Sequence, residues 1–192
     1  MSSALLERHR VEARTPGPCP VVATSRLVLR PHWLSDAGSI TESLSDFALS
    51  RMLARVPQPY DRQDALDWLQ IQVSGSVTGW SAAITMEDDV HIGIVSLDLR
   101  AGAWRLGYWL NRYYWGRGIM TEATGGLLDR FFRRMPDVTI GSGAFADNAA
   151  SLKIQQKLGF RITGCSEMYS LSRNAVVAHI DTALQPEDLR RL

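Results

Sequence analysis

Two hydrophobic periods follow each other in the second half of the chain. Aromatic and aliphatic residues run together through Trp104–Leu110, which predicts a strand. Apolar residues then recur at helical spacing within residues 121–134, at Leu127, Leu128, Phe131 and Phe132, which predicts an amphipathic helix. The segment between them, Tyr114-Trp115-Gly116-Arg117-Gly118, is therefore a glycine-containing turn from a strand into a helix.

The same criteria place the other elements. Predicted strands alternate in polarity or are rich in β-branched residues, and predicted helices carry an apolar stripe behind a capping residue. The strands are residues 21–30, 79–84, 90–99, 138–145, 160–162 and 176–184, and the helices begin near Ser35, Asp61 and Ala149. Pro31 ends the first strand, Asp61 and Asp64 supply cap-like acids, and Gly159 ends the last helix.

The connections indicate the topology. Short polar turns, including Glu87-Asp88-Asp89, join residues 79–110 into an antiparallel meander. The helix over residues 121–134 then crosses to a new strand, which implies parallel pairing. We therefore expect an α/β fold with a mixed, mostly antiparallel central sheet and helices on its faces.

The turn before the helix suits a phosphate. Gly116 and Gly118 allow a tight backbone that can approach a ligand closely, and the first N–H groups of the helix lack intrahelical partners. The segment is neither a Walker A loop nor a dinucleotide-binding fingerprint. An ordinary strand–helix connection would use the same two glycines, so the motif alone does not decide between the two interpretations.

Composition narrows the class of protein. Lysine and arginine total 21 and aspartate and glutamate total 20, so no strong charge indicates a nucleic-acid or membrane partner. We find neither an apolar run of membrane-spanning length nor a signal peptide. Two cysteines, Cys19 and Cys165, favour a reducing, cytoplasmic location. The spacing of the four histidines does not predict a metal site.

The N-terminus reads as an extension of a single domain. Residues 1–22 include the proline-rich segment Thr15-Pro16-Gly17-Pro18-Cys19-Pro20, which suits neither a helix nor a central strand. We predict an N-terminal extension over residues 1–22 and one domain over residues 23–192. We expect removal of residues 1–20 to leave the fold intact.

Three motifs carry a resemblance to a known family. Leu106 to Ala123 resembles the acetyl-CoA-binding motif of the GNAT superfamily, most closely the branch of ribosomal-protein N-terminal (alanine) acetyltransferases. Asp147 to Ser151 with Lys157 to Phe160 resembles the second motif of that branch, and Ser25 to Pro31 resembles its opening strand. The likeness runs from about residue 24 to about residue 184. It implies the GNAT fold, with a splayed strand pair in the sheet.

The resemblance implies which residues bind acetyl-CoA. Backbone N–H groups around Arg117, Gly118, Ile119, Met120 and Thr121 would hold the pyrophosphate, with Trp115 and Gly116 in the same loop. The backbone of Trp109 or Leu110 would meet the thioester oxygen, and Asn148 would bond the pantetheine or cap the following helix. Met120 stands where the family usually has alanine or glycine. Its side chain must point away from the phosphates or narrow the site that binds them.

Catalysis is where the sequence departs furthest from the family. The usual acidic residue of the Glu-Leu-Gly-Tyr motif is Arg105, so the base would be Asp98, Glu167 or a water relay. The position where the family usually has a tyrosine acid holds Gln155. Ser151 would then donate the proton to the thiolate, or its hydroxyl would have a structural role only. Gly141 and Gly143 share one strand face, where they would widen the pantetheine slot or let a helix pack closely.

These observations predict an acetyl-CoA-dependent N-acetyltransferase that needs no metal. The acceptor would be a primary amine, either a protein N-terminus or a small molecule, with no nucleic-acid or membrane partner. The alternative is a catalytically silent acyl-CoA-binding module of the same fold, which the losses at Arg105 and Gln155 favour. Exposed edge strands are compatible with a homodimer.

Overall fold

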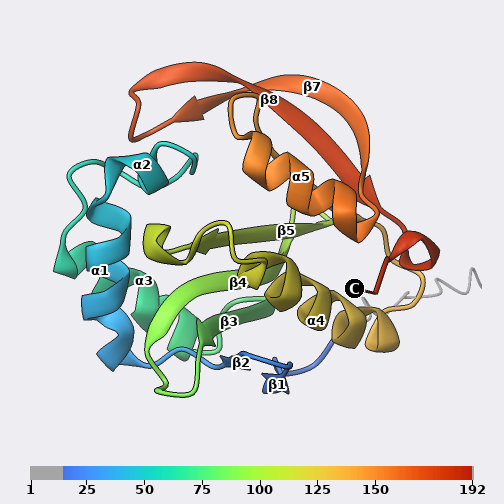
Figure 1. Cartoon of the computed structure of the whole chain (residues 1–192), viewed down its shortest axis with the longest axis horizontal. Coiled ribbons are helices and arrows are strands. Elements are labelled where there is room, and N and C mark those ends of the chain that lie inside the picture. The colour runs from blue at the N-terminus through green and yellow to red at the C-terminus, as the bar shows by residue number, and fades with distance from the viewer. Residues whose placement is uncertain (1–14, 192) are drawn as a thin grey trace, which may run out of the picture.

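The predicted meander and crossover form one open sheet in the computed structural model, which describes residues 15–191 (Figure 1). The sheet has the strand order β1-β2-β3-β4-β5-β6-β8-β7, and all its pairs are antiparallel except β5 with β6. The strands are β1 Val22–Ala23, β2 Val28–Arg30, β3 Gly79–Thr85, β4 His91–Arg100, β5 Ala103–Leu110, β6 Ile140–Phe145, β7 Arg161–Ser170 and β8 Ala175–Leu184. The mixed, mostly antiparallel sheet expected from the sequence is confirmed.

Five α-helices and three short 3₁₀ turns connect the described strands. The helices are α1 Ala37–Ser45, α2 Phe47–Ser50, α3 Arg62–Val73, α4 Ile119–Arg134 and α5 Ala149–Leu158, and the 3₁₀ turns are η1 Leu34–Asp36, η2 Arg112–Tyr114 and η3 Pro186–Asp188. Asp61 caps α3 in a capping box with Asp64, as predicted. Gly159 ends α5 with φ of 103°, as also predicted. None of the helices described here is long and apolar enough to cross a membrane.

Helices cover both faces of the sheet, and strand periodicity determines which residues each face receives. On β5, Leu106 and Leu110 join the core beneath α4, while Trp109 packs with Ile94 of β4 beneath α1 and α3. We call the side of the sheet that bears Arg105, Gly107 and Trp109 the α1 face, and the other side the α4 face.

The parallel pair β5–β6 separates soon after it forms. Only Trp104 with Ile140 and Arg105 with Gly141 are paired, although both strands continue for several more residues. The hydroxyl of Ser142 donates to the carbonyl of Leu106 at 3.2 Å, where a backbone donor would otherwise bond. The strands therefore splay toward their carboxyl ends, as the sequence resemblance implied.

Some boundaries differ from those predicted. The predicted strand over residues 21–30 is two short strands, because Thr24 to Leu27 form a turn closed by an N–H···O bond of 2.9 Å. Phe47 was placed on the apolar stripe of the first helix but is 51% exposed. It begins α2, where Asp46 caps the new helix by accepting from the Ala48 N–H at 2.8 Å.

Residues 15–22 lie against the domain. The buried indole of Trp80 donates to the carbonyl of Gly17 at 2.9 Å, and Arg134 donates to the carbonyls of Pro16 and Pro18. Val22 is 4% exposed. Residues of the extension therefore contribute contacts to the domain, and the effect of removing residues 1–20 stays a prediction. Residues 1–14 lie outside the described part of the chain, and the boundary at residue 23 stays a prediction.

The tip of the β7–β8 hairpin is tied to the segment after α1. The Leu171 N–H donates to the Ala54 carbonyl at 3.0 Å, and the Ser172 hydroxyl donates to the Ser50 carbonyl at 3.0 Å. Arg173 donates to the Arg51 carbonyl at 2.6 Å. These bonds join segments about 120 residues apart, and we call them the hairpin clasp.

Candidate active site

The turn before α4 presents unpartnered backbone N–H groups. Gly116 and Gly118 have φ of 75° and 74°, a conformation that side chains disfavour. Gly118 is the N-cap of α4, and no side chain caps it. The first intrahelical bond runs from the Glu122 N–H to the Gly118 carbonyl, so the N–H groups of Ile119, Met120 and Thr121 precede it. Their number and polarity suit an anionic group such as a pyrophosphate.

Glu122 holds this turn against the first strands. One carboxylate oxygen accepts from Thr24 Oγ1, Ser25 Oγ and the Arg26 N–H, at 2.7, 2.8 and 2.9 Å. The other pairs with the Arg26 guanidinium at 2.6 Å, and that guanidinium also donates to the Arg117 carbonyl. Burial works against ionisation, but the bonds from Thr24, Arg26 and Ser25 prevail and lower the pKa of Glu122 to about 2. The loop is thus anchored by a carboxylate that the sequence analysis did not single out.

The side chains of Trp115, Arg117 and Met120 leave the backbone N–H groups at the start of α4 uncovered. Met120 is 5% exposed and points into the core beside Thr124, so it faces away from the helix N-terminus. Trp115 donates its indole N–H to the Leu110 carbonyl at 2.7 Å, which fixes the loop to the end of β5. Arg117 is exposed, with its guanidinium 5.7 Å from the centre of the Tyr114 ring.

On the α4 face, polar groups fill the gap between β5 and β6. The Tyr108 hydroxyl lies 2.8 Å from the Ser151 hydroxyl and 3.2 Å from the Ser151 carbonyl. The Gln155 amide nitrogen bonds Ser151 Oγ, the Tyr108 hydroxyl and the Gly143 carbonyl at 3.2, 3.3 and 3.1 Å. Burial raises the pKa of Tyr108, against these bonds. Gln155, which cannot act as an acid, thus holds two hydroxyls that can.

Asn148 has the capping role that the sequence offered as one of two. Its Oδ1 accepts from the Ser151 N–H at 3.1 Å, at the start of α5. The hydroxyl of Ser151 is therefore not needed to cap the helix, and it is left to Tyr108 and Gln155.

On the α1 face, the two glycines of β6 make room for side chains. A Cβ at Gly141 would come within 2.8 Å of the Arg105 guanidinium, and one at Gly143 within 2.3 Å of the His179 ring. From the sequence, Gly141 and Gly143 would either widen the pantetheine slot or let a helix pack closely. The neighbours are instead an arginine of β5 and a histidine of β8.

His179 and Asp181 form a pair beside this gap. Nδ1 of His179 lies 3.1 Å from Oδ1 of Asp181, and the histidine side chain is 12% exposed. Neither residue was a candidate from the sequence, because nothing local marks a histidine and an aspartate two residues apart on a strand.

The two carboxylates named as candidate bases lie differently. Asp98 is paired with Arg105 in the sheet register, and its carboxylate accepts from Arg100 and from the Ser96 hydroxyl. Glu167 pairs with Ala178, one residue from His179, and therefore lies on the opposite face of the hairpin. Asp98 shares the α1 face with the histidine pair, and Glu167 does not.

A separate buried cluster joins α1 to β4. His32, Asp36 and His91 bring one ligand-type atom each within 4.8 Å of one another, and burial lowers the pKa of His32 to about 3 and of His91 to about 4. Both oxygens of Asp36 already accept from Arg30, at 2.8 and 3.0 Å. The sequence spacing gave no sign of this cluster, because the fold alone brings the histidines together.

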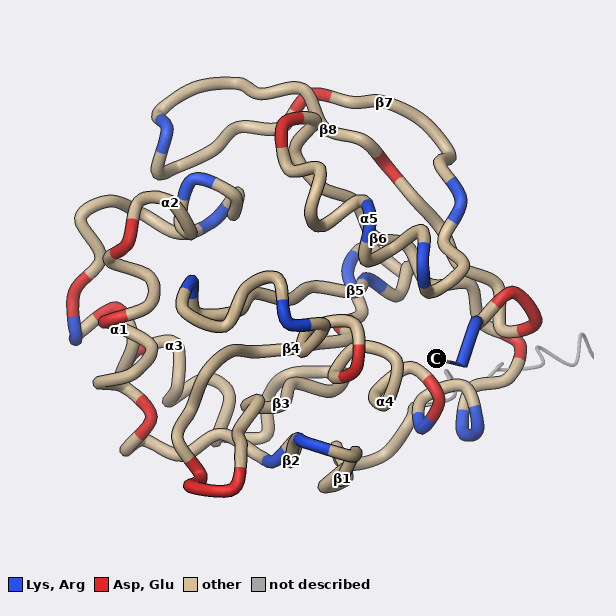
Figure 2. Tube along the Cα trace, in the orientation of Figure 1, with Lys and Arg blue, Asp and Glu red and all other residues tan. Residues whose placement is uncertain are grey.

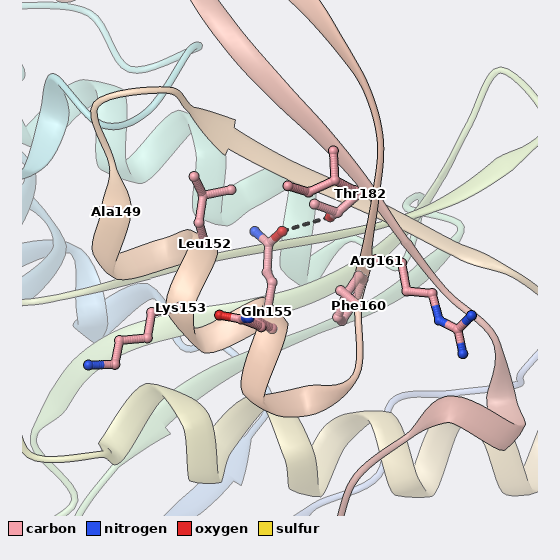
Figure 3. A pocket seen from close by; sticks show the side chains of 9 residues that line it. Ala149, Leu152, Lys153, Gln155, Phe160, Arg161 and Thr182 are labelled. Carbon is pink, nitrogen blue, oxygen red and sulfur yellow. Dashed lines mark hydrogen bonds between the residues drawn. The ribbon is translucent and has the colours of Figure 1, made fainter.

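A cavity of about 600 Å³ lies beside α5 (Figure 3). Its lining includes Ala149, Leu152 and Lys153 of α5 and Arg161 and Ile162 of β7, with Gln155 bonded to Thr182 at its floor. The lining contains no residue of the loop before α4 or of β5, so this cavity is not the space between β5 and β6.

A family comparison agrees with this geometry. The family model described as an acetyltransferase (GNAT) domain matches residues 26–161. The chain belongs to the GNAT acetyltransferase family. The loop before α4, the splayed strands and α5 all lie within the matched region or overlap it.

Individual relatives of this GNAT chain include proteins of several bacteria. The N-acetyltransferase p20 of Bacillus licheniformis, itself uncharacterised, is 26% identical over 160 residues, which are 80% of this chain and 89% of that protein. The ribosomal-protein-S5-alanine acetyltransferase of Vibrio fischeri superposes with a TM-score of 0.74 at 21% identity, covering 90% of this chain and all of that one. RimJ of Mycobacterium smegmatis, solved with a CoA disulfide, gives a TM-score of 0.72 at 21% identity, covering 86% and 84%.

Proposed function

We propose that the chain transfers an acetyl group from acetyl-CoA directly to a primary amine, which is either a protein N-terminal α-amine or the amine of a small molecule. The observation that carries the proposal is the position of the α4 N-terminus next to the splayed end of β5. Unpartnered N–H groups at residues 119–121 suit the pyrophosphate, and the unpaired edges of β5 and β6 suit an extended amide-containing arm.

The donor would be held mainly by backbone. Trp115, Gly116, Arg117 and Gly118 form the loop, and Ile119, Met120 and Thr121 supply N–H groups. Trp109 and Leu110 belong to the strand whose backbone would meet the thioester oxygen. The side-chain oxygen of Asn148 caps α5, so its amide nitrogen would be the group that bonds acetyl-CoA.

The chemistry needs the acceptor amine neutral and the thiolate stabilised. An α-amine, with a pKa of about 8, is partly neutral near pH 7, so its deprotonation needs only a weak base. The thiolate, with a pKa of about 8.5, would take a proton from the Ser151 hydroxyl, which is hydrogen-bonded to the Tyr108 hydroxyl. This donor pair replaces the tyrosine that Gln155 displaces.

Charge distribution, free cysteines and an exposed strand edge bear on the partners, the location and the oligomeric state that we propose. Positive and negative residues are both scattered over the trace (Figure 2) and nearly cancel in number, which suits neither a nucleic-acid nor a membrane partner. Cys19 and Cys165 are both free, consistent with a cytoplasmic location. The β7 edge exposes Ile162, Met168 and Tyr169, which would suit a homodimer contact.

A panel of amines tests the proposal against a catalytically silent acyl-CoA-binding module. We would incubate the protein with acetyl-CoA and amino-terminal peptides, free amino acids, polyamines or aminoglycosides, and measure CoA thiol release together with product mass. We expect at least one acceptor to gain 42 Da with one thiol released per acetyl. Acetyl-CoA binding by calorimetry without acetylation of any class would favour the silent module.

A further inference from the structure

We propose that His179, oriented by Asp181, accepts the proton from the attacking amine. The inference rests on the proposed function and supplies the base that the sequence left open among Asp98, Glu167 and water. It is carried by the strand register around the β5–β6 gap and by one carboxylate contact.

The register places His179 at the edge of that gap. Ser96 pairs with Gly107 across β4 and β5, and Gly143 pairs with Asp181 across β6 and β8. Because Arg105 pairs with Gly141, Gly107 and Gly143 stand at the same level on either side of the splay. All these positions share the α1 face, so at this level the gap has a glycine on each side.

The histidine ring occupies the space that Gly143 leaves. Cε1 and Nε2 of His179 come within 2.3 and 3.0 Å of the point where a Cβ of residue 143 would stand. The ring therefore covers β6 on the α1 face.

Asp181 determines which ring nitrogen is the base. A carboxylate only accepts hydrogen bonds, so the contact of 3.1 Å makes Nδ1 of His179 the N–H donor. The proton-free nitrogen is then Nε2, which lies closer than Nδ1 to the position of a Cβ on Gly143. Tautomer and ring orientation are both fixed by one aspartate on the same strand.

The other charged groups near the pair are Arg105, Arg173 with its partner Asp147, and Asp98. The Arg105 guanidinium lies over Gly141 on the same face, and the Arg173 guanidinium lies 4.8 Å from the centre of the Phe145 ring, which contacts His179 edge-on. The partner of His179 on β7 is the uncharged Ser166. Asp181 is thus the carboxylate that bonds the ring, while Asp98 is occupied by Arg100 and Ser96.

The transfer step balances with these groups. The neutral amine nitrogen attacks the thioester carbonyl carbon, and a C–N bond forms. The proton that leaves the nitrogen goes to Nε2 of His179, and the C–S bond breaks. The thiolate leaves with the electron pair and takes a proton from the hydrogen-bonded hydroxyls of Ser151 and Tyr108, which recover a proton from water. The imidazolium then returns its proton to water.

Kinetics of four variants test the inference, with the acceptor found by the amine panel. We expect His179→Ala to lower kcat by about 10²-fold or more, with acetyl-CoA affinity and melting temperature unchanged, and free imidazole to restore part of the rate. Asp181→Asn should also lower kcat, because an amide that donates to Nδ1 would leave the ring proton on Nε2, the nitrogen that must accept. Gly143→Ala should lower kcat, because its Cβ would displace the ring and would also meet the Ile180 carbonyl. Gly164→Ala, whose Cβ would meet nothing within 4 Å, should leave kcat unchanged.

Three results would overturn the inference: a His179→Ala enzyme with full kcat and an unchanged pH profile, a loss that imidazole does not rescue, or a loss that parallels donor affinity and melting temperature. Failure of the proposed function looks different, because the unmodified chain would then acetylate no amine. In that case the inference falls with it.

Discussion

The hydroxyl of Tyr108 lies 2.8 Å from the hydroxyl of Ser151. A side chain from β5 thereby reaches the first turn of α5, across the gap in which the family binds its donor. The family's usual tyrosine in this helix is replaced by Gln155, whose amide holds both hydroxyls. Under the proposed function, the phenol of Tyr108 on β5 would take the role of the phenol that the family usually has on the helix.

We predict that Ser151→Ala lowers kcat by about 10²-fold, the lower end for general acid catalysis, and leaves acetyl-CoA affinity nearly unchanged. Tyr108→Phe should have a similar effect, and the double variant should cost little more than the larger single loss, because both hydroxyls serve one proton. Steady-state kinetics and calorimetry measure these changes. Ser142→Ala, which removes a hydroxyl bonded to the Leu106 carbonyl instead, is the matched control. Fully additive losses would assign the two hydroxyls separate roles.

Gly118→Glu should abolish acetyl-CoA binding in a folded protein. The new carboxylate would repel the phosphates at the helix N-terminus, and φ of 74° would strain any side chain. Isothermal calorimetry with acetyl-CoA measures the loss. Gly75→Glu is a matched control, because Gly75 has φ of 71° and open surroundings. Undiminished affinity in a folded Gly118→Glu protein would remove this loop from the donor site.

Glu122 should make stability depend on pH in the acidic range. Its folded pKa of about 2 lies below the ordinary value of 4.5. The stabilisation is therefore complete above pH 4.5 and is lost as the pH falls toward 2. We expect Glu122→Gln to lower the unfolding free energy by about 1–3 kcal/mol at pH 7, with the difference from the unmodified protein vanishing near pH 2. Urea unfolding at several pH values measures this, with the exposed Glu87→Gln as control. A difference independent of pH would contradict the assignment.

Removing residues 1–20 should lower the melting temperature. The deletion takes away the carbonyl partner of the Trp80 indole and the two carbonyls that Arg134 binds. A buried donor left without a partner costs about 1–3 kcal/mol, and each kcal/mol lowers the melting temperature of a chain this size by about 2–4 °C. Trp80→Phe in the truncated chain should recover part of the loss, because it removes the orphaned donor. A truncated protein that melts with the full chain would show that these contacts contribute nothing.

The sequence predicted the parts of the site that are continuous along the chain. Residues 115–121 form the expected loop because glycines and a helix start act locally, and Asn148 caps α5 for the same reason. The sequence also left Met120 with two alternatives, and burial beside Thr124 decides for the one that points away from the phosphates.

Residues brought together by pairing of distant strands could not be predicted. His179 reaches Gly143 because β6 pairs with β8 rather than with its sequence neighbour β7. A lone histidine on a strand carries no periodic signal that would indicate this. For Arg105, the sequence showed that the family's usual carboxylate is missing. It did not show that the guanidinium fills the space above Gly141.

The hairpin clasp has a consequence for how an acceptor is chosen. Leu171, Ser172 and Arg173 bond main-chain carbonyls of residues 50–54, so the hairpin tip and the segment after α1 are joined through the main chain. Lifting the hairpin would break three hydrogen bonds and the ion pair between Arg173 and Asp147. We therefore expect the hairpin tip to stay in place when an acceptor of the proposed reaction binds, so that size and shape would exclude acceptors more than an induced rearrangement would.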